Sequence, residues 1–124
     1  MKEKFSFEKL KAYEKARDLI KMVYSVIKEF PEEERYALGK QIQRAAVSIA
    51  ANLAEGSGRI SAKEKIHFIE ISFGSLMEVF CELQIATDLG YIGKEVLENL
   101  RPQFQTASQL LSGLRNYFLS TINN

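Results

Sequence analysis

Apolar residues recur at alternating three- and four-residue steps through four long segments, and this spacing constrains the fold more than any other feature. Residues three and four apart lie on one face of an α-helix, so each segment is expected to form a helix with a continuous apolar face. No stretch of alternating apolar and polar residues competes with this pattern. In chain order, the four faces are Tyr13, Ala16, Ile20, Val23, Ile27 and Phe30; Leu38, Ile42, Ala45, Ile49 and Leu53; Ile66, Ile69, Phe73, Leu76, Phe80 and Leu83; and Leu97, Leu100, Phe104, Ala107, Leu111, Leu114 and Phe118.

A few helix-breaking residues separate these segments. Pro31 ends the first, because the residue before a proline is pushed out of the helical region. Gly56 is a good carboxy-terminal cap for the second segment, and Gly90 ends the third. Ser61 and Glu64 match the capping box that opens a helix. We therefore expect helices at about residues 7–30, 33–55, 61–89 and 94–119.

Apolar residues that repeat every 3.5 positions on average favour left-handed packing of helices that cross at about 20°. Short connections join helices that are antiparallel neighbours. A chain of 124 residues fits one domain. We predict an all-α protein, an up-down-up-down antiparallel left-handed four-helix bundle that spans residues 1–124. Pro102 removes a backbone donor inside the fourth segment, so it should kink or divide that helix near Leu100 and Arg101.

Composition excludes several classes of protein. Hydrophobic residues make up 46% of the chain and charged residues 27%, which is typical of a folded domain and not of a disordered one. No apolar stretch approaches the roughly 20 residues that span a bilayer. The amino terminus lacks the apolar core of a signal peptide, and one cysteine suits a reducing compartment. We expect a cytoplasmic protein without a membrane partner.

No pattern typical of an enzyme occurs. His67 is the only histidine, whereas a helical di-metal site needs a second histidine and inward carboxylates. Nucleophile motifs, zinc motifs and phosphate-binding loops are missing from the sequence, and the glycine-rich segment 55–59 is interpreted as a turn between helices. Cys81 is expected to pack as a small hydrophobe. We predict no catalytic activity and no metal or cofactor.

Basic residues are unevenly placed although the net charge is only +1. Residues 1–21 carry seven basic and four acidic side chains, and residues 35–54 carry three basic and no acidic ones, so each stretch has a local charge of +3. Repetition of such a patch around an oligomer could suffice for phosphate binding, whereas the alternative is a solvated face. The candidate nucleic-acid-binding residues are Arg35, Lys40, Arg44, Arg59 and Lys63.

Asn52 is the next seam position after Ala45 and Ile49, so it is expected to be a buried polar group that needs a partner. Glu55 and Arg59 follow near the end of the bundle and are the candidate partners. We interpret Asn52 and Glu55 as structural polar residues that fix the register and the turn.

The apolar content of two segments exceeds what one bundle can bury. Small residues surround most of the second segment in the run AAVSIAANLA, and the third carries Phe68, Ile71, Val79 and Ile85 off its main seam. A large exposed apolar patch usually marks an interface, and a closed ring of identical subunits buries such patches without open-ended growth. We therefore expect a homo-oligomer.

Long ordered motifs resemble one family over nearly the whole chain. They are RAAVSIAANLAEGSGR at 44–59, SAKEKIHFIEISFGSLMEV at 61–79 and LGYI at 89–92, with FEKLKAYEKA at 7–16 and FPEEERYAL at 30–38. These are similar to the bacterial four-helix-bundle proteins of the 23S ribosomal RNA intervening sequences. That resemblance implies a cyclic homopentamer of poorly defined role. The related accessory variability determinants of diversity-generating retroelements imply binding of nucleic acid and of a protein partner through a basic pentameric barrel.

The expected function is therefore a non-catalytic, homo-oligomeric scaffold, pentameric by resemblance, that binds RNA or DNA through a repeated basic surface. The alternative is a purely structural or protein-recognition oligomer without nucleic-acid binding.

Overall fold

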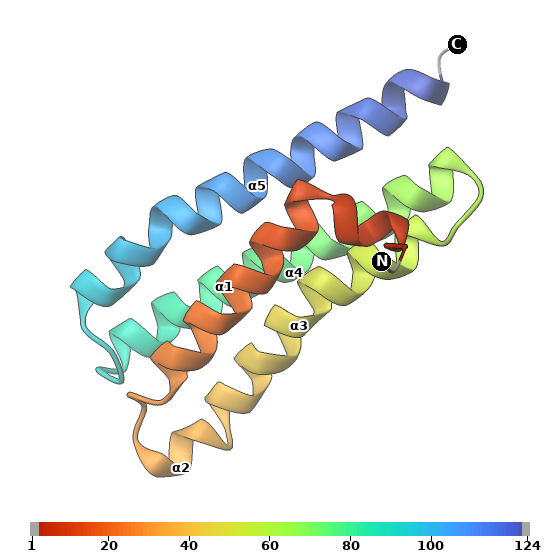
Figure 1. Ribbon diagram of the computed structural model, residues 1–124. Helices are drawn as coiled ribbons and strands as arrows, with labels where there is room; N and C mark the ends of the chain where they lie inside the picture. Colours follow the sequence, from red (N-terminus) through yellow and green to blue (C-terminus); the bar gives the residue numbers. More distant parts are fainter. Residues whose placement is uncertain (1–2, 123–124) are drawn as a thin grey trace.

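Four long helices of alternating direction form a bundle in the computed structural model, which describes residues 3–122 (Figure 1). A 3-10 helix η1 precedes α1, and the single-turn helix α2 lies between α1 and α3. No strand occurs in this described part of the chain, and the predicted all-helical antiparallel bundle is confirmed. The elements are η1 (Ser6–Lys9), α1 (Lys11–Ile27), α2 (Glu32–Arg35), α3 (Leu38–Ser57), α4 (Ala62–Asp88) and α5 (Lys94–Ile122).

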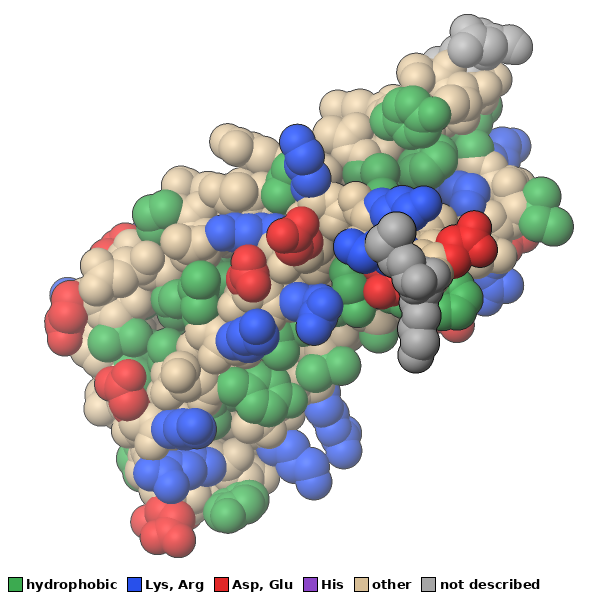
Figure 2. Space-filling model, viewed as in Figure 1, with side chains coloured by type: hydrophobic (Ala, Val, Ile, Leu, Met, Phe, Trp, Pro, Cys, Tyr) green, Lys and Arg blue, Asp and Glu red, His purple; other side chains and the backbone are tan. Residues whose placement is uncertain are grey.

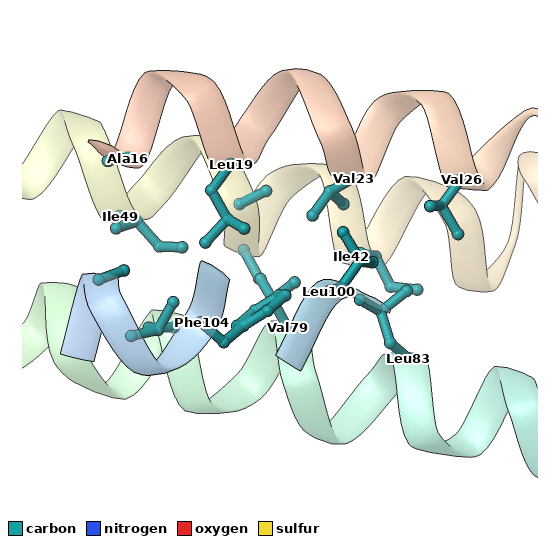
Figure 3. Close-up of a cluster of buried hydrophobic side chains, with 14 of the residues drawn as sticks. Ala16, Leu19, Val23, Val26, Ile42, Ile49, Val79, Leu83, Leu100 and Phe104 are labelled. Atoms are coloured by element: carbon teal, nitrogen blue, oxygen red, sulfur yellow. The ribbon is translucent and has the colours of Figure 1, made fainter. Parts of the chain in front are cut away.

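The core lies where the inner faces of the four long helices meet, and each helix packs against the two neighbours beside it. Figure 3 shows Leu19 and Val23 of α1 pointing toward Phe104 of α5 and Val79 of α4 across this core. The predicted apolar faces supply most of it. Phe73 and Phe80 are only partly buried, whereas Val79, placed off the main seam by the sequence pattern, is fully buried.

The first predicted helix is wrong at its amino-terminal end, because Leu10 is extended and separates η1 from α1. The break lets Leu10 turn toward the open end of the bundle, where it lines a small cavity with Leu53 and Leu114. Phe7 packs edge-on against Tyr13 with 4.9 Å between ring centroids. Burial of apolar side chains over the bundle end therefore outweighs continuation of the helix.

The second predicted helix is also divided, since Ala37 has non-helical backbone angles between α2 and α3. At the other end α3 continues to Ser57, so Gly56 is not a left-handed cap but a buried residue inside the helix. A Cβ atom added at Gly56 would lie 2.7 Å from Cβ of Phe68 on α4. The glycine is therefore needed for the close approach of two helices. Gly90, with φ of 79°, is the one residue among 3–122 with positive φ, and it ends α4 as predicted.

Pro102 lies inside α5, and the helix runs through it from Lys94 to Ile122. The expected division near Leu100 is wrong, because Leu100 and Phe104 are both buried against the neighbouring helices on either side of the proline. Packing of this face compensates for the missing backbone hydrogen bond. A kink at Pro102 stays a prediction.

Within residues 3–122, every helix is too short or too polar to cross a bilayer.

Candidate nucleic-acid interface

The structure places the five basic candidates at three separate positions. Arg35 lies in α2, at the bundle end where α3 begins, and Arg59 and Lys63 lie near the α3–α4 turn at the opposite end. The 20 residues of α3 between these ends span about 30 Å. Only Lys40 and Arg44, one helical turn apart on α3, share a helix face.

Arg35 is held by contacts within the chain. Its Nε donates a hydrogen bond to the carbonyl oxygen of Phe30 at 3.1 Å, and its Nη2 donates to that of Lys28 at 2.8 Å. These carbonyls follow the last turn of α1, where backbone acceptors lack helical partners. Arg35 therefore braces the α1–α2 connection.

Arg59 is also engaged, between two carboxylates and an aromatic ring. Its guanidinium nitrogens lie 3.9 Å from Glu55 and 3.8 Å from Glu64, and Cζ lies 4.8 Å from the ring centroid of Phe68. Ser61 caps α4 by accepting a hydrogen bond from the Glu64 backbone N–H at 3.1 Å, which confirms this half of the predicted capping box. Arg59 and Glu55 thus pair at the turn, and their exposure makes the pair weak.

Lys40 and Arg44 are exposed, and among residues 3–122 no carboxylate oxygen lies within 4.0 Å of the charged nitrogens of either side chain. Val47 and Ala51, also exposed, continue this face of α3 toward its end. Lys63 is exposed in the first turn of α4. On the face turned toward the viewer, Figure 2 shows Lys and Arg side chains in separate groups, with acidic and apolar side chains between them. The accessible basic face is thus small in one subunit.

Lys2, part of the amino-terminal basic stretch, lies outside the described residues. Lys15 in α1 donates a hydrogen bond to Oε1 of Gln103 in α5, and Arg17 lies 5.9 Å from the ring centroid of Tyr13. Two of the basic side chains of this stretch are therefore involved in contacts within the bundle.

Asn52 is only partly buried, and its partner is not the one expected. Its Nδ2 donates to the carbonyl oxygen and to Oγ of Ser48, each at 2.8 Å, and Ser48 Oγ lies 2.9 Å from Oγ of Ser75 on α4. Glu55 and Arg59 project from the following turns and pair with each other instead. Asn52 thus belongs to a polar chain that links α3 to α4, consistent with a structural role.

The buried polar residues of α4 were not predicted from the sequence. Ser72, Ser75 and Glu82 are buried, and the Ser72 hydroxyl donates to the carbonyl oxygen of Ile49 at 2.7 Å. A second heptad pattern on this helix marks the face that packs on α3. Its members are Phe68, Ser72, Ser75, Val79, Glu82 and Ala86. We name the contact of this face with α3 the small-residue seam.

Glu82 is the one titratable residue on the α4 face of the seam. Its Oε2 accepts a hydrogen bond from Nε2 of Gln41 on α3, and its Oε1 is buried without a partner. Burial raises the pKa of the Glu82 carboxyl above its ordinary value of 4.5, and the charge of Glu78 raises it further, while the Gln41 hydrogen bond opposes both.

Cys81 is exposed, so its expected burial is wrong. It lies on the exposed side of α4 and lines an open groove of about 620 Å³ with Phe80, Arg101 and Gln105, among others. His67 is exposed on α4 and contacts the edge of Phe68, with 5.5 Å between ring centroids. Among residues 3–122, no group of three His, Cys, Asp or Glu side chains could hold a metal ion.

Comparison with known proteins gives a family and a related structure. Residues 8–113 match the family described as 23S rRNA-intervening sequence protein. The fold resembles the crystal structure of a protein of unknown function from the S23 ribosomal protein family of Bacteroides thetaiotaomicron, with a TM-score of 0.62 and 20% identity over 91% of this chain and 99% of that one. No curated protein matches the chain. Because the family match covers most of its length, the chain belongs to the 23S rRNA-intervening sequence protein family.

Proposed function

We propose that this protein is a non-catalytic, cytoplasmic homo-oligomeric scaffold, a pentamer by its sequence resemblance, that binds RNA or DNA through a repeated basic face. The observation that supports binding is the exposed pair Lys40 and Arg44 on α3, in a stretch of twenty residues, 35–54, with no acidic side chain. Arg35 and Arg59 are occupied by intramolecular contacts and are weaker candidates. One subunit offers few phosphate contacts, so affinity would depend on repetition of this face around a ring.

Assembly is supported by the outer face of α4. Ile71 is 38% exposed and Ile85 43% exposed, and these residues lie fourteen positions apart on one side of the helix. Gly74 lies between them in sequence, and a Cβ added there would meet no atom within 4 Å. We assign this face to contact with a second copy of the chain, because burying exposed isoleucines and closely packing small residues stabilises association.

The test of assembly compares two charge substitutions. Ile71→Glu combined with Ile85→Glu should convert a particle of about five times 14.1 kDa into single subunits that keep their helix content, as measured by light scattering and circular dichroism. Ile60→Glu is the matched control, because Ile60 is 98% exposed in the α3–α4 turn and lies off the α4 face. A wild-type protein that is a folded single subunit at micromolar concentration would refute the proposed ring.

The test of binding uses fluorescently labelled single-stranded RNA and anisotropy at several salt concentrations. Lys40→Ala with Arg44→Ala should weaken binding at all sequences and reduce the salt slope by about 0.7 for each phosphate that is no longer neutralised. Lys28→Ala with Lys94→Ala removes the same charge elsewhere on the exposed surface and should leave the slope unchanged. Absence of wild-type binding at low salt would exclude the nucleic-acid role.

A second candidate is a structural or protein-recognition oligomer that binds no nucleic acid. The net charge of +1 favours it, as does the exposed Glu78, which lies on α4 within the same register interval as Arg44 on α3. In this second function the protein partner would be a reverse transcriptase, as the resemblance to the accessory variability determinants implies. An intact ring with no salt-dependent RNA or DNA binding would support it.

A further inference from the structure

One ionisable side chain is buried in the bundle without an ionic partner. Glu82 is 4% exposed, and it is the one charged residue among the buried residues of the described chain. Its Oε2 accepts from the Gln41 amide, and its Oε1 has no hydrogen-bond partner. A buried carboxylate oxygen without a donor carries a desolvation cost that the protonated carboxyl avoids.

The surroundings of Glu82 follow from the register of the small-residue seam. Gln41 pairs with Glu82, and Ser48 pairs with Ser75, so the two antiparallel helices each advance seven residues between these contacts. Arg44 therefore lies on α3 between the two contacts, and Glu78 lies between them on α4. Two polar pairs at this spacing hold the helices in a single register.

The charged groups around Glu82 do not neutralise it. On its own helix, Glu78 is four residues earlier on the same face and is acidic. On α3, the nearest basic residues in sequence to Gln41 are Lys40 and Arg44, and both are exposed. Arg35 of α2 is bound to the carbonyl oxygens of Phe30 and Lys28. Across all described elements, α1 and α5 included, no basic nitrogen lies within 4.0 Å of the Glu82 carboxylate.

We propose that Glu82 takes up a proton from solvent when the bundle folds, which makes the Gln41 end of the small-residue seam a proton-sensitive contact. Protonation forms an O–H bond on the Glu82 carboxyl and removes its negative charge beside Glu78. Ionisation at higher pH restores an unpaired buried charge and loosens α3 from α4 at this end. The proposal depends neither on nucleic-acid binding nor on a ring.

The direction of the pH effect follows from linkage. The pKa of Glu82 in the folded chain is raised above its ordinary value of 4.5 by burial and by Glu78. The stabilisation from the neutral carboxyl is therefore fully present below pH 4.5 and is lost as pH rises through the folded-state pKa. Glu98 shows the opposite trend, because the hydrogen bond from Arg101 lowers its pKa.

The test is urea unfolding of wild type and Glu82→Gln from pH 4 to 8.5, at one protein concentration and one ionic strength. Glutamine keeps the shape and mimics the neutral carboxyl. The folding equilibrium constant of Glu82→Gln relative to wild type should rise with pH, by up to tenfold per unit between the unfolded and folded pKa values. Glu98→Gln is the matched control, and its stability relative to wild type should not rise with pH anywhere in this range, because the pKa of Glu98 is lowered by Arg101 and its ionisation is complete at lower pH.

Two further measurements keep the proposal testable if Glu82→Gln folds poorly. The carboxyl-carbon chemical shift of Glu82 in the intact wild-type protein should titrate with a midpoint above 4.5, and Glu78→Gln should lower that midpoint. Amide hydrogen exchange in residues 39–45 should be faster in wild type than in Glu82→Gln at pH 8 and equal at pH 4. A wild-type midpoint at or below 4.5, or parallel stability curves for wild type and Glu82→Gln, would overturn the proposal.

Discussion

The two sides of the bundle achieve close packing in different ways. Along the small-residue seam, α3 and α4 meet through serines and glycine, with Gly56 against Phe68 and the hydroxyl of Ser72 on the Ile49 carbonyl. On the α5 side, large apolar side chains fill the space, and Phe104 lies edge-on to Phe80 at 5.1 Å between ring centroids. The seam therefore depends on small size and on specific polar partners, whereas the α5 side depends on apolar volume.

This difference shows what each side contributes. Apolar volume supplies most of the burial free energy but tolerates exchange of one hydrophobe for another of similar size. Polar pairs such as Ser48 with Ser75 contribute less free energy and are satisfied in one register only. The α5 side therefore contributes more to the magnitude of the stability, and the seam contributes more to the specificity of the register.

Removing apolar volume on the α5 side should have the strongest effect. Phe104→Ala should lower the free energy of unfolding by about 3–5 kcal/mol, because it leaves a cavity beside Phe80. Urea unfolding followed by circular dichroism measures the change. Tyr117→Ala on the same helix is the control, since Tyr117 is 61% exposed and its loss should cost within about 0.5 kcal/mol. Equal losses for the two variants would contradict the assigned core.

The second-largest loss of stability is expected from adding one methyl group to the small-residue seam. Gly56→Ala should lower the free energy of unfolding by about 1–3 kcal/mol, because the new Cβ meets Cβ of Phe68 at 2.7 Å and one helix must shift. The same unfolding measurement applies. If Gly56→Ala stabilised the protein, as helix propensity alone predicts, the close approach of α3 and α4 would be wrong.

Removing one seam hydroxyl should have a moderate effect. Ser72→Ala deletes the donor to the Ile49 carbonyl oxygen and should cost about 1 kcal/mol. Ser25→Ala, at an exposed position of α1, serves as the control and should be neutral within about 0.5 kcal/mol. If Ser72→Ala and Ser25→Ala changed the free energy of unfolding equally, the distinction between the seam and the surface would be wrong.

The same substitution at a glycine on α5 should change the free energy of unfolding in the opposite direction to Gly56→Ala. Gly113 is exposed in the helix, and a Cβ added there meets no atom within 4 Å. Gly113→Ala should raise the free energy of unfolding by about 0.5–1 kcal/mol through lower backbone entropy of the unfolded chain. Destabilisation at both glycines would mean that the two sides of the bundle do not differ in this way.

Much of the fold was predictable because helical periodicity is a local property. The apolar faces around Val23, Ile49 and Leu111 follow from spacing alone, and each is buried as expected. The breaks at Leu10 and Ala37 were not predictable, since neither carries a proline or glycine signal. The break at Leu10 accompanies its position beside Leu53 and Leu114 at the end of the bundle, which brings together residues far apart in the sequence.

The candidate site was predictable in composition and not in arrangement. The basic side chains Arg35 and Arg59 look equivalent to Lys40 and Arg44 in the sequence, and only the structure shows that the first two are engaged by carbonyl oxygens and carboxylates. Likewise, Asn52 was identified as polar and structural, while its Ser48 partner depends on side-chain geometry within α3 and its link to Ser75 on the packing of α4.

By itself, the sequence determined four amphipathic helices, their approximate ends and their antiparallel order, because a 3.6-residue period and short connections act over neighbouring residues. Only the tertiary structure decided which face of α4 meets α3, and with it the burial of Glu82 beside Gln41. Exposure of a side chain depends on what packs over it, and that is set by the whole bundle and not by the segment that carries the residue.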